Sequence, residues 1–423
     1  MKIIEGFEPA KVALSRRISA EFYHTDLEPK VKQIIDEVRR RGDAALFDYT
    51  RKLDGAKLTS LEVSKKQIKS AYQQVDKELI SALKLAAKRI RSYHQKQKRS
   101  IWSMATKKGF GQLIRPLERI GAYAPGGTAC YPSTVLMTAI PARVAGVKEV
   151  MLVTPPKANG KVPAPTLIAA DIAQVDRIFS VGGAQAIAAL AFGTKSIPRV
   201  DKVCGPGNIF VVLAKKLVYG IVGIDGLAGP SEVLIIADET ANPGYCAADL
   251  LAQAEHDPLA SAILLTTSRR LADEVAQEVK KQLKGLERHT IANESLQKRG
   301  LIAVVADISE AIELANLYAP EHLCLMAKGA DAYIDQLANA GCIFIGDNST
   351  VVLGDYVFGP SHVLPTGATA RFSSPLNILD FTKFISLVDV DKASLKQLGR
   401  AASIIARAEG FNAHARAVEK RLK

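Results

Sequence analysis

An amide and an imidazole lie close together in residues 247–258, at the end of a predicted helix. Pro258 is expected to stop this helix, with Gln253 and His256 in its last turn. A spacing of three places the two side chains on one face, where an amide oxygen and a ring nitrogen can bind a borderline metal such as zinc. Two ligands do not make a site, and the alternative is a terminal histidine that interacts only with the helix dipole.

Five polar residues further along the chain are candidate partners for this pair. They are Glu321, His322, Asp355, His362 and His414. Asp355 and His414, added to the amide and the imidazole, would complete a mixed nitrogen and oxygen site of four ligands. Glu321 could orient the adjacent His322 or take a separate role in proton transfer. The alternative is that Glu321 and His322 are only two polar groups in water at the start of a strand. The residues alone do not decide between a catalytic role and this structural one.

Three glycine-rich turns follow predicted strands between residues 118 and 237. They are Tyr123-Ala124-Pro125-Gly126-Gly127, Gly182-Gly183-Ala184-Gln185 and Cys204-Gly205-Pro206-Gly207-Asn208. Glycines at such turns let a pyrophosphate approach the backbone and the start of a helix. No turn has the G-x-G-x-x-G spacing of common nicotinamide sites, and tight strand–helix turns are the alternative. The side chains of Tyr123, Gln185 and Asn208 inside them favour a ligand.

The elements that must position these residues alternate between short strands and helices from about residue 118 onward. Val-rich and Ile-rich strands such as Glu149–Thr154 and Glu232–Ala237 are separated by Ala-rich helical segments. This alternation predicts an α/β protein with two Rossmann-like, doubly wound parallel-sheet units of similar build. A helical region precedes them and a small helical appendage follows them.

The predicted domains divide the chain into four parts. Residues 1–25 form an N-terminal arm. Residues 26–117 and 238–376 form a first, discontinuous α/β domain that carries most of the zinc and catalytic site. Residues 118–237 form a second α/β domain with the cofactor loops, and residues 377–423 form a C-terminal helical segment.

Composition excludes several classes of protein. The net charge of +13 suggests a nucleic-acid binder. The positive residues, however, are interleaved with acids and lack an aromatic RNA-binding motif. A basic surface also suits an anionic ligand such as a dinucleotide. No apolar run is long enough to cross a bilayer, and the N-terminus shows no secretory signal. Five scattered cysteines without a C-x-x-C pair argue against a disulfide framework and favour the cytoplasm.

Several motifs along nearly the whole chain resemble those of the histidinol dehydrogenase family. Beyond the three glycine-rich turns, the motifs are Ala228-Gly229-Pro230-Ser231-Glu232, Gln253-Ala254-Glu255-His256-Asp257, Pro320-Glu321-His322-Leu323, Gly354-Asp355-Tyr356 and Ser361-His362-Val363-Leu364-Pro365-Thr366. Each motif alone is a weak signal, but together and in this order they are specific.

The resemblance implies a role for each candidate residue. The zinc ligands fall on Gln253, His256, Asp355 and His414. The catalytic pair falls on Glu321 and His322. The substrate contacts fall on the metal ligands, the catalytic pair, Ser231, His362 and Glu409. The NAD contacts fall on Tyr123, Gln185 and Asn208. The resemblance also implies a homodimer in which His414 and Glu409 complete the site of the partner subunit.

The expected activity is the oxidation of L-histidinol through L-histidinal to L-histidine, the last two steps of histidine biosynthesis, with one zinc ion per subunit and two molecules of NAD. His322 would act as general base in both oxidations, and Glu321 would activate the water that hydrates the aldehyde. Two other classes of protein are alternatives: a zinc hydrolase or lyase acting on an imidazole-bearing substrate without redox chemistry, and a binding or scaffold protein that uses its basic surface.

Overall fold

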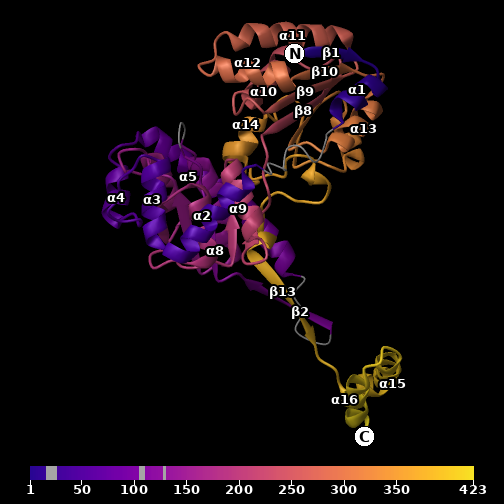
Figure 1. Cartoon of the computed structure of the whole chain (residues 1–423). Coiled ribbons are helices and arrows are strands. Elements are labelled where there is room, and N and C mark those ends of the chain that lie inside the picture. Colours follow the sequence, from indigo (N-terminus) through magenta and orange to yellow (C-terminus); the bar gives the residue numbers. More distant parts are fainter. Residues whose placement is uncertain (16–25, 104–109, 127–129) are drawn as a thin grey trace.

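The computed structural model describes residues 1–15, 26–103, 110–126 and 130–423. The predicted arm is therefore described only up to residue 15, and Gly127 of the first glycine-rich turn lies outside the described residues. Two parallel sheets covered by helices form the body of the molecule (Figure 1).

The first sheet has six parallel strands. In spatial order they are β1 (Lys2–Glu5), β10 (Leu301–Val304), β9 (Ser261–Thr266), β8 (Glu232–Ala237), β11 (His322–Met326) and β12 (Cys342–Ile345). The central strand β8 is buried on both faces because alternate residues enter different cores. Val233 and Ile235 pack under the helices α10 (Pro243–Ala254), α11 (Arg269–Leu283) and α12 (His289–Arg299). Leu234 and Ile236 pack under α1 (Phe7–Leu14) and α13 (Ile308–Tyr318).

The second sheet has five parallel strands. In spatial order they are β5 (Arg177–Ser180), β4 (Glu149–Thr154), β3 (Arg119–Tyr123), β6 (Lys202–Cys204) and β7 (Gly223–Ile224). One face packs against α4 (Lys65–Ala71), α5 (Lys77–Trp102), α6 (Pro132–Ala145) and α7 (Ala164–Ile172). The other face packs against α2 (Glu28–Arg41), α3 (Asp43–Leu53), α8 (Gly183–Phe192) and α9 (Ile209–Val218).

Both sheets are wound in the same way. Counted along the chain from β3 and from β8, the five strands of each unit lie in the order 3-2-1-4-5, and β1 extends the six-stranded sheet at its edge. The strand order therefore reverses between β3 and β6 in one unit and between β8 and β11 in the other. This confirms the prediction of two doubly wound units of similar build. In open parallel sheets of this kind, ligands are expected beyond the carboxyl ends of the strands at such a reversal.

The predicted grouping of residues 26–117 with residues 238–376 is wrong, because helices α2 to α5 pack on the five-stranded sheet instead. The apolar stripe of α5, including Leu83, Ala86 and Ile90, contributes to the same core as α6. The N-terminal region is also not simply an arm as predicted, because residues 2–5 form strand β1 at the edge of the six-stranded sheet. An amphipathic pattern reveals that one helix face is buried, but not which of two sheets covers it.

The C-terminal segment leaves the body along a two-stranded antiparallel ribbon. Its strands are β13 (Thr382–Val388) and β2 (Phe110–Pro116), neither of which was predicted. The predicted C-terminal helices are confirmed as α15 (Lys392–Ala408) and α16 (Asn412–Leu422), which pack against each other. In Figure 1 this helix pair lies apart from both sheets. Several of its large apolar side chains are exposed: Leu398, Ile404, Ile405 and Phe411.

Short helical turns complete the fold between β11 and the ribbon. They are η1 (Ala330–Gln336), α14 (Val351–Leu353), η2 (Gly354–Phe358), η3 (Thr369–Arg371) and η4 (Ile378–Phe381). The turn η2 is a π-helical turn, a form that is rare and frequent at functional sites. Within the described ranges, every helix is too short or too polar to span a membrane.

Candidate active site

The predicted catalytic pair lies at the start of β11, beside the start of β8. Helix α13 ends at Ala319 in a left-handed conformation, and Pro320 directs the chain into the strand. Glu321 and His322 are both buried, with 6% and 3% of their surfaces exposed. The Nδ1 atom of His322 donates to the carbonyl oxygen of Glu232 at 2.9 Å, and Nε2 lies 3.3 Å from Oδ1 of Asp355.

Burial and neighbouring charges shift the pKa of each member of this cluster. Burial raises the pKa of Glu321, and the positive charge of His322 opposes this shift. Burial alone would lower the pKa of His322, but the charge of Glu321 and the hydrogen bond to Asp355 raise it. Burial would raise the pKa of Asp355, yet the hydrogen bond from His322 keeps it low. The buried carboxylates thus hold His322 in its protonated form in this arrangement.

Asp355 and His362 are held together by the turn η2. The ring of His362 donates through Nδ1 to the carbonyl oxygen of Asp355 at 2.9 Å. Its Nε2 atom lies 3.3 Å from the hydroxyl oxygen of Thr134 on α6. Burial lowers the pKa of His362, although the charge of Asp355 opposes the shift. A neutral ring that donates through one nitrogen and accepts from Thr134 through the other fits this environment.

Gln253 and His256 lie where α10 ends. The helix stops at Ala254, so His256 lies just beyond it rather than in its last turn, but its peptide N–H still donates to the carbonyl oxygen of Gln253 at 3.2 Å. Gln253 is buried, and His256 is exposed at one side. Desolvation by the surrounding protein nevertheless lowers the pKa of His256, although the negative charge of Asp355 opposes this shift. His256, His322 and His362 therefore lie around Asp355, close enough for their charges to interact.

His414 and Glu409 are not brought to this cluster within one chain. Both are exposed on the C-terminal helix pair, where the ring of His414 packs on Phe411 with centroids 5.2 Å apart. Over the described ranges, no three His, Cys, Asp or Glu side chains of one chain converge as a metal site. Of the four predicted ligands, the imidazole of His256 lies near enough to the carboxylate of Asp355 for their charges to interact, and Gln253 lies three residues before His256 at the end of α10.

The predicted cofactor residues meet at the carboxyl ends of β3, β5 and β6. The hydroxyl oxygen of Tyr123 accepts from the peptide N–H of Gly183 at 3.2 Å, and burial raises the pKa of Tyr123 to about 12. Gln185 is 1% exposed, and its Oε1 atom has no hydrogen-bond partner among the described residues. Asn208 caps the N-terminus of α9 by accepting from two peptide N–H groups.

The turn after β6 is pressed against β3 so closely that only glycine fits. Gly205 has φ +111°, and a Cβ atom there would lie 2.1 Å from the carbonyl oxygen of Tyr123. A buried ion pair between Lys215 and Asp225 supports the turn, because Lys215 donates to the carbonyl oxygen of Gly205 and Asp225 accepts from its N–H. The unpartnered oxygen of Gln185 and the glycine-rich turns before helices α8 and α9 suit a ligand with hydrogen-bond donors and a pyrophosphate.

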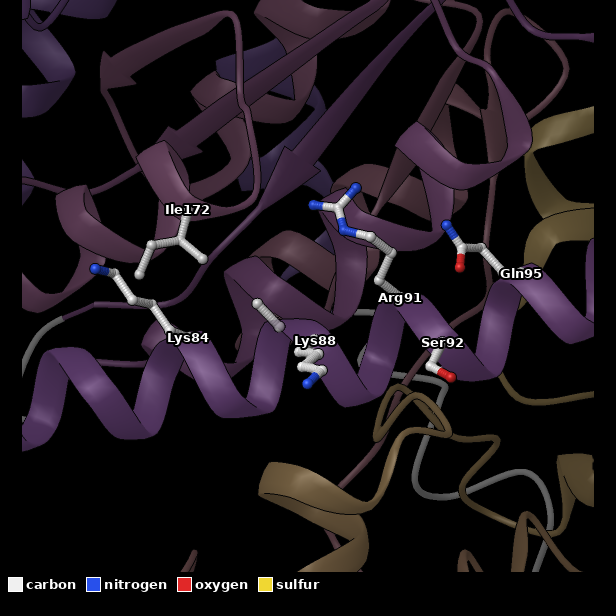
Figure 2. Close-up of a pocket in the computed structure, with 7 residues that line it drawn as sticks. Lys84, Lys88, Arg91, Ser92, Gln95 and Ile172 are labelled. Atoms are coloured by element: carbon white, nitrogen blue, oxygen red, sulfur yellow. The ribbon is translucent and has the colours of Figure 1, made fainter.

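A cavity of about 280 Å³ lies where the two units meet. Its walls include Gly205 after β6, the connection to β8 at residues 225–228, and Val363, Leu364 and Pro365 after His362. A second hollow, of about 480 Å³, lies along α5 and is lined by Lys84, Ala87, Lys88, Arg91, Ser92, Gln95 and Ile172 (Figure 2). This hollow contains none of the predicted site residues and is separate from the cluster around Asp355.

The sequence did not predict two residues that contact the cluster. Thr134 contacts His362, and Glu232 contacts both members of the catalytic pair. Glu232 lies beside Ser231 in the motif of residues 228–232, which could have indicated it. Thr134 shows no local signal, because only the fold brings it to the site.

Two doubly wound parallel sheets, with a buried acid–base pair on one and glycine-rich turns on the other, define an α/β enzyme. A sequence model of the family described as histidinol dehydrogenase matches residues 18–422. The chain belongs to this family of oxidoreductases.

Its relatives match over all or nearly all of their length. The chain is 59% identical to histidinol dehydrogenase from Dehalococcoides mccartyi strain CBDB1, with all of both chains covered. It is 50% identical to the enzyme of the same name from Clostridium acetobutylicum, covering 93% of this chain and 92% of the relative. A crystal structure of histidinol dehydrogenase from Elizabethkingia anophelis superposes with a TM-score of 0.93 at 38% identity, over 100% of this chain and 98% of that one.

Proposed function

We propose that this enzyme oxidises L-histidinol to L-histidine by way of L-histidinal, with two molecules of NAD as electron acceptors and zinc as cofactor. The observation that carries the proposal is the buried pair of Glu321 and His322 beside Asp355, in a chain of this family. The test is an assay that counts NADH formed per histidinol consumed. Two per molecule is the expected result. Consumption of substrate without NADH would instead favour a non-redox zinc enzyme.

His322 is proposed to take the hydroxyl proton in each oxidation. Its Nδ1 atom donates to the carbonyl oxygen of Glu232, which fixes the ring and leaves Nε2 as the nitrogen that faces the site. Nε2 has to be free of the contact with Asp355 before it can accept a proton. In the first oxidation the carbinol loses that proton and a hydride to become an aldehyde. In the second, the hydrated aldehyde loses the same two species to become a carboxylic acid, which then releases a further proton to solvent and becomes the carboxylate.

Glu321 is proposed to activate the water that adds to the aldehyde. Burial raises its pKa, and a carboxylate in a buried site is a stronger base than one in water. The peptide N–H of Glu232 donates to its Oε2 atom at 2.8 Å, which fixes the direction of the carboxylate. The Oε2 atom also lies 3.6 Å from Nδ1 of His322, so the two groups influence each other's protonation.

The residues that would hold zinc are Gln253, His256, Asp355 and His414. This donor set of oxygen and nitrogen atoms suits a borderline divalent ion. Zinc, when bound, would fix the imidazole and amine of the amino alcohol and so orient its carbinol. Ser231, His362 and Glu409 would contribute the remaining substrate contacts. Ser231 immediately precedes β8, and His362 lies at Asp355, so both are near the proposed metal ligands.

The residues that would hold NAD are Tyr123, Gln185 and Asn208. Tyr123 ends β3 and Asn208 follows β6, the two strands between which the order of the five-stranded sheet reverses, and Gln185 lies in α8 after β5. NAD, when bound, accepts the hydride. The unpartnered Oε1 atom of Gln185 supports this assignment, because a ribose or amide donor would satisfy it. The tight turn at Gly205 would let the cofactor approach the backbone.

A homodimer with shared sites is the proposed assembly. The helix pair α15 and α16 lies apart from the body of its own chain (Figure 1) and exposes Ile404, Ile405 and Phe411, which a second copy would cover. His414 and Glu409 would then complete the partner's site. The proposed location is the cytoplasm, which agrees with five cysteines that form no disulfide in the described part of the chain.

A further inference from the structure

Glu232 is a buried carboxylate that no step of the proposed reaction uses. It is the first residue of β8, is 4% exposed, and lies beside the start of β11, where the register pairs Val233 with His322. A buried carboxylate is costly unless hydrogen bonds compensate for the lost water. The contacts of Glu232 are therefore informative about why an acid is present there.

The main chain of Glu232 contacts both members of the catalytic pair. Its carbonyl oxygen accepts from Nδ1 of His322 at 2.9 Å, and its peptide N–H donates to Oε2 of Glu321 at 2.8 Å. One residue thus sets the tautomer of the proposed base and the direction of the proposed water-activating carboxylate. Any movement of Glu232 would be transmitted to both groups.

The side chain of Glu232 ties this position to two other segments. Its Oε2 atom accepts from the peptide N–H of Glu321 at 3.3 Å, so Glu232 and Glu321 hold each other reciprocally. Its Oε1 atom accepts from the peptide N–H of Gly367 at 3.1 Å. The next residue back, Thr366, accepts through Oγ1 from the N–H of Gly229. The carboxylate therefore joins the start of β11 to the segment that follows His362.

We propose that Glu232 is a positioning residue for this reaction. Its carboxylate holds the catalytic pair and the segment carrying His362 in one fixed arrangement, so that the substrate is presented correctly to both. The inference rests on the proposed function, since it concerns the same site. It assigns Glu232 no contact with the substrate and no proton of its own.

Substitution can separate this role from simple packing. Glutamine has nearly the same volume but only one acceptor oxygen, so Glu232→Gln cannot satisfy both peptide N–H groups. Glu232→Asp keeps two acceptors and the charge but retracts them by one methylene. Misplacement of reacting groups by about 1 Å can cost about 100-fold in rate. Both variants should therefore lower kcat, whereas an acid needed only to fill space would tolerate glutamine.

The experiment measures NADH formation from L-histidinol, with thermal unfolding as a check on folding. Glu232→Gln is expected to lower kcat by about 10- to 100-fold and to change KM by less than about 3-fold. The Tm should stay within a few degrees of the parent. Glu313→Gln, on the exposed face of α13, is the matched control and should behave as the parent. If Glu232→Gln does not fold, Glu232→Asp takes its place.

A double variant decides whether Glu232 acts through Glu321. If Glu232 acts through Glu321, the double variant should have a kcat less than about 3-fold below that of Glu321→Gln alone, because the carboxylate that Glu232 positions is already lost. Losses that multiply in a His322→Asn background as well as in the Glu321→Gln background, or a Glu232→Gln enzyme with parental kcat, would overturn the inference. Failure of the parent enzyme to form NADH would overturn the proposed function instead, so the two failures are distinguishable.

Discussion

His322 reaches Asp355 through its Nε2 atom, which lies 3.3 Å from the carboxylate oxygen. Its other nitrogen contacts a carbonyl oxygen, so both partners of the ring are acceptors and the ring carries two protons in this arrangement. The proposed general base and a proposed zinc ligand therefore share one hydrogen bond. Asp355 has to turn from the imidazole to the metal before His322 can serve as a base.

Replacing His322 by asparagine should depress both oxidations. Loss of a general base typically costs about 100- to 10,000-fold, and the amide keeps a donor for the carbonyl oxygen of Glu232. NADH formation should be measured separately with histidinol and with histidinal as substrates. Retention of either rate within a few-fold of the parent would show that another group removes the proton.

Replacing Glu321 by glutamine should depress the aldehyde oxidation more than the alcohol oxidation, because only the former needs added water. The change should also move the acid limb of the pH profile for alcohol oxidation. The rate rises with pH as His322 loses its proton, and the charge of Glu321 raises the pKa of His322. Removing that charge lowers the pKa, so the limb should shift to lower pH. An unmoved limb, or equal loss of both steps, would contradict this division of roles.

Replacing His256 by alanine should remove zinc and activity together. A metal site that loses one of four ligands loses most of its affinity. Metal content can be measured by atomic emission on purified protein, alongside NADH formation. His289→Ala provides the matched control, since His289 is exposed at the start of α12 and is not one of the proposed zinc ligands. Stoichiometric zinc in the His256 variant would remove this residue from the ligand set.

Mixed dimers should reveal whether His414 acts in trans. His322→Asn and His414→Ala homodimers should each be inactive. If sites are shared, a heterodimer has one site with both defects and one intact site, so random mixing should restore about a quarter of parental activity. Co-expression with two different affinity tags allows the heterodimer to be purified and assayed. No recovery in the purified heterodimer would place His414 in its own chain's site or outside any site.

Replacing Asp54 by asparagine should stabilise the protein above about pH 6 but not below about pH 4. Burial raises the pKa of Asp54 to about 6, and its Oδ2 atom has no hydrogen-bond partner among the described residues. The folded state therefore binds its proton more tightly than the unfolded state, and stability falls as pH rises through this window. At about pH 8 the free energy of unfolding should increase by about 1 kcal/mol, after allowance for the partial exposure of Asp54.

The check for Asp54 is the pH dependence of urea unfolding. Asp331→Asn, at an exposed position on η1, should leave the curve unchanged. A constant difference between the Asp54 variant and its parent at all pH values would mean that the substitution acts through packing rather than through the charge.

The sequence predicted those parts of the fold and site that depend on local pattern. Alternating strands and helices indicated the two sheets. The spacing along the chain could not show that His256, His322 and His362 would lie around Asp355, because His256 and His322 are far from Asp355 in sequence. The sheet that covers α5 could not be predicted, because an apolar stripe does not identify its partner. The pairing of β2 with β13 joins residues 110–116 to residues 382–388, and neither segment alternates clearly. Glu232 and Thr134 reach the site only through tertiary contacts.

The two sheets present opposite ends to the region between them: Tyr123 and Cys204 end their strands, whereas Glu232 and His322 begin theirs. The turns after β3, β5 and β6, where NAD is proposed to bind, could therefore be diversified to change the electron acceptor without altering the proposed catalytic pair.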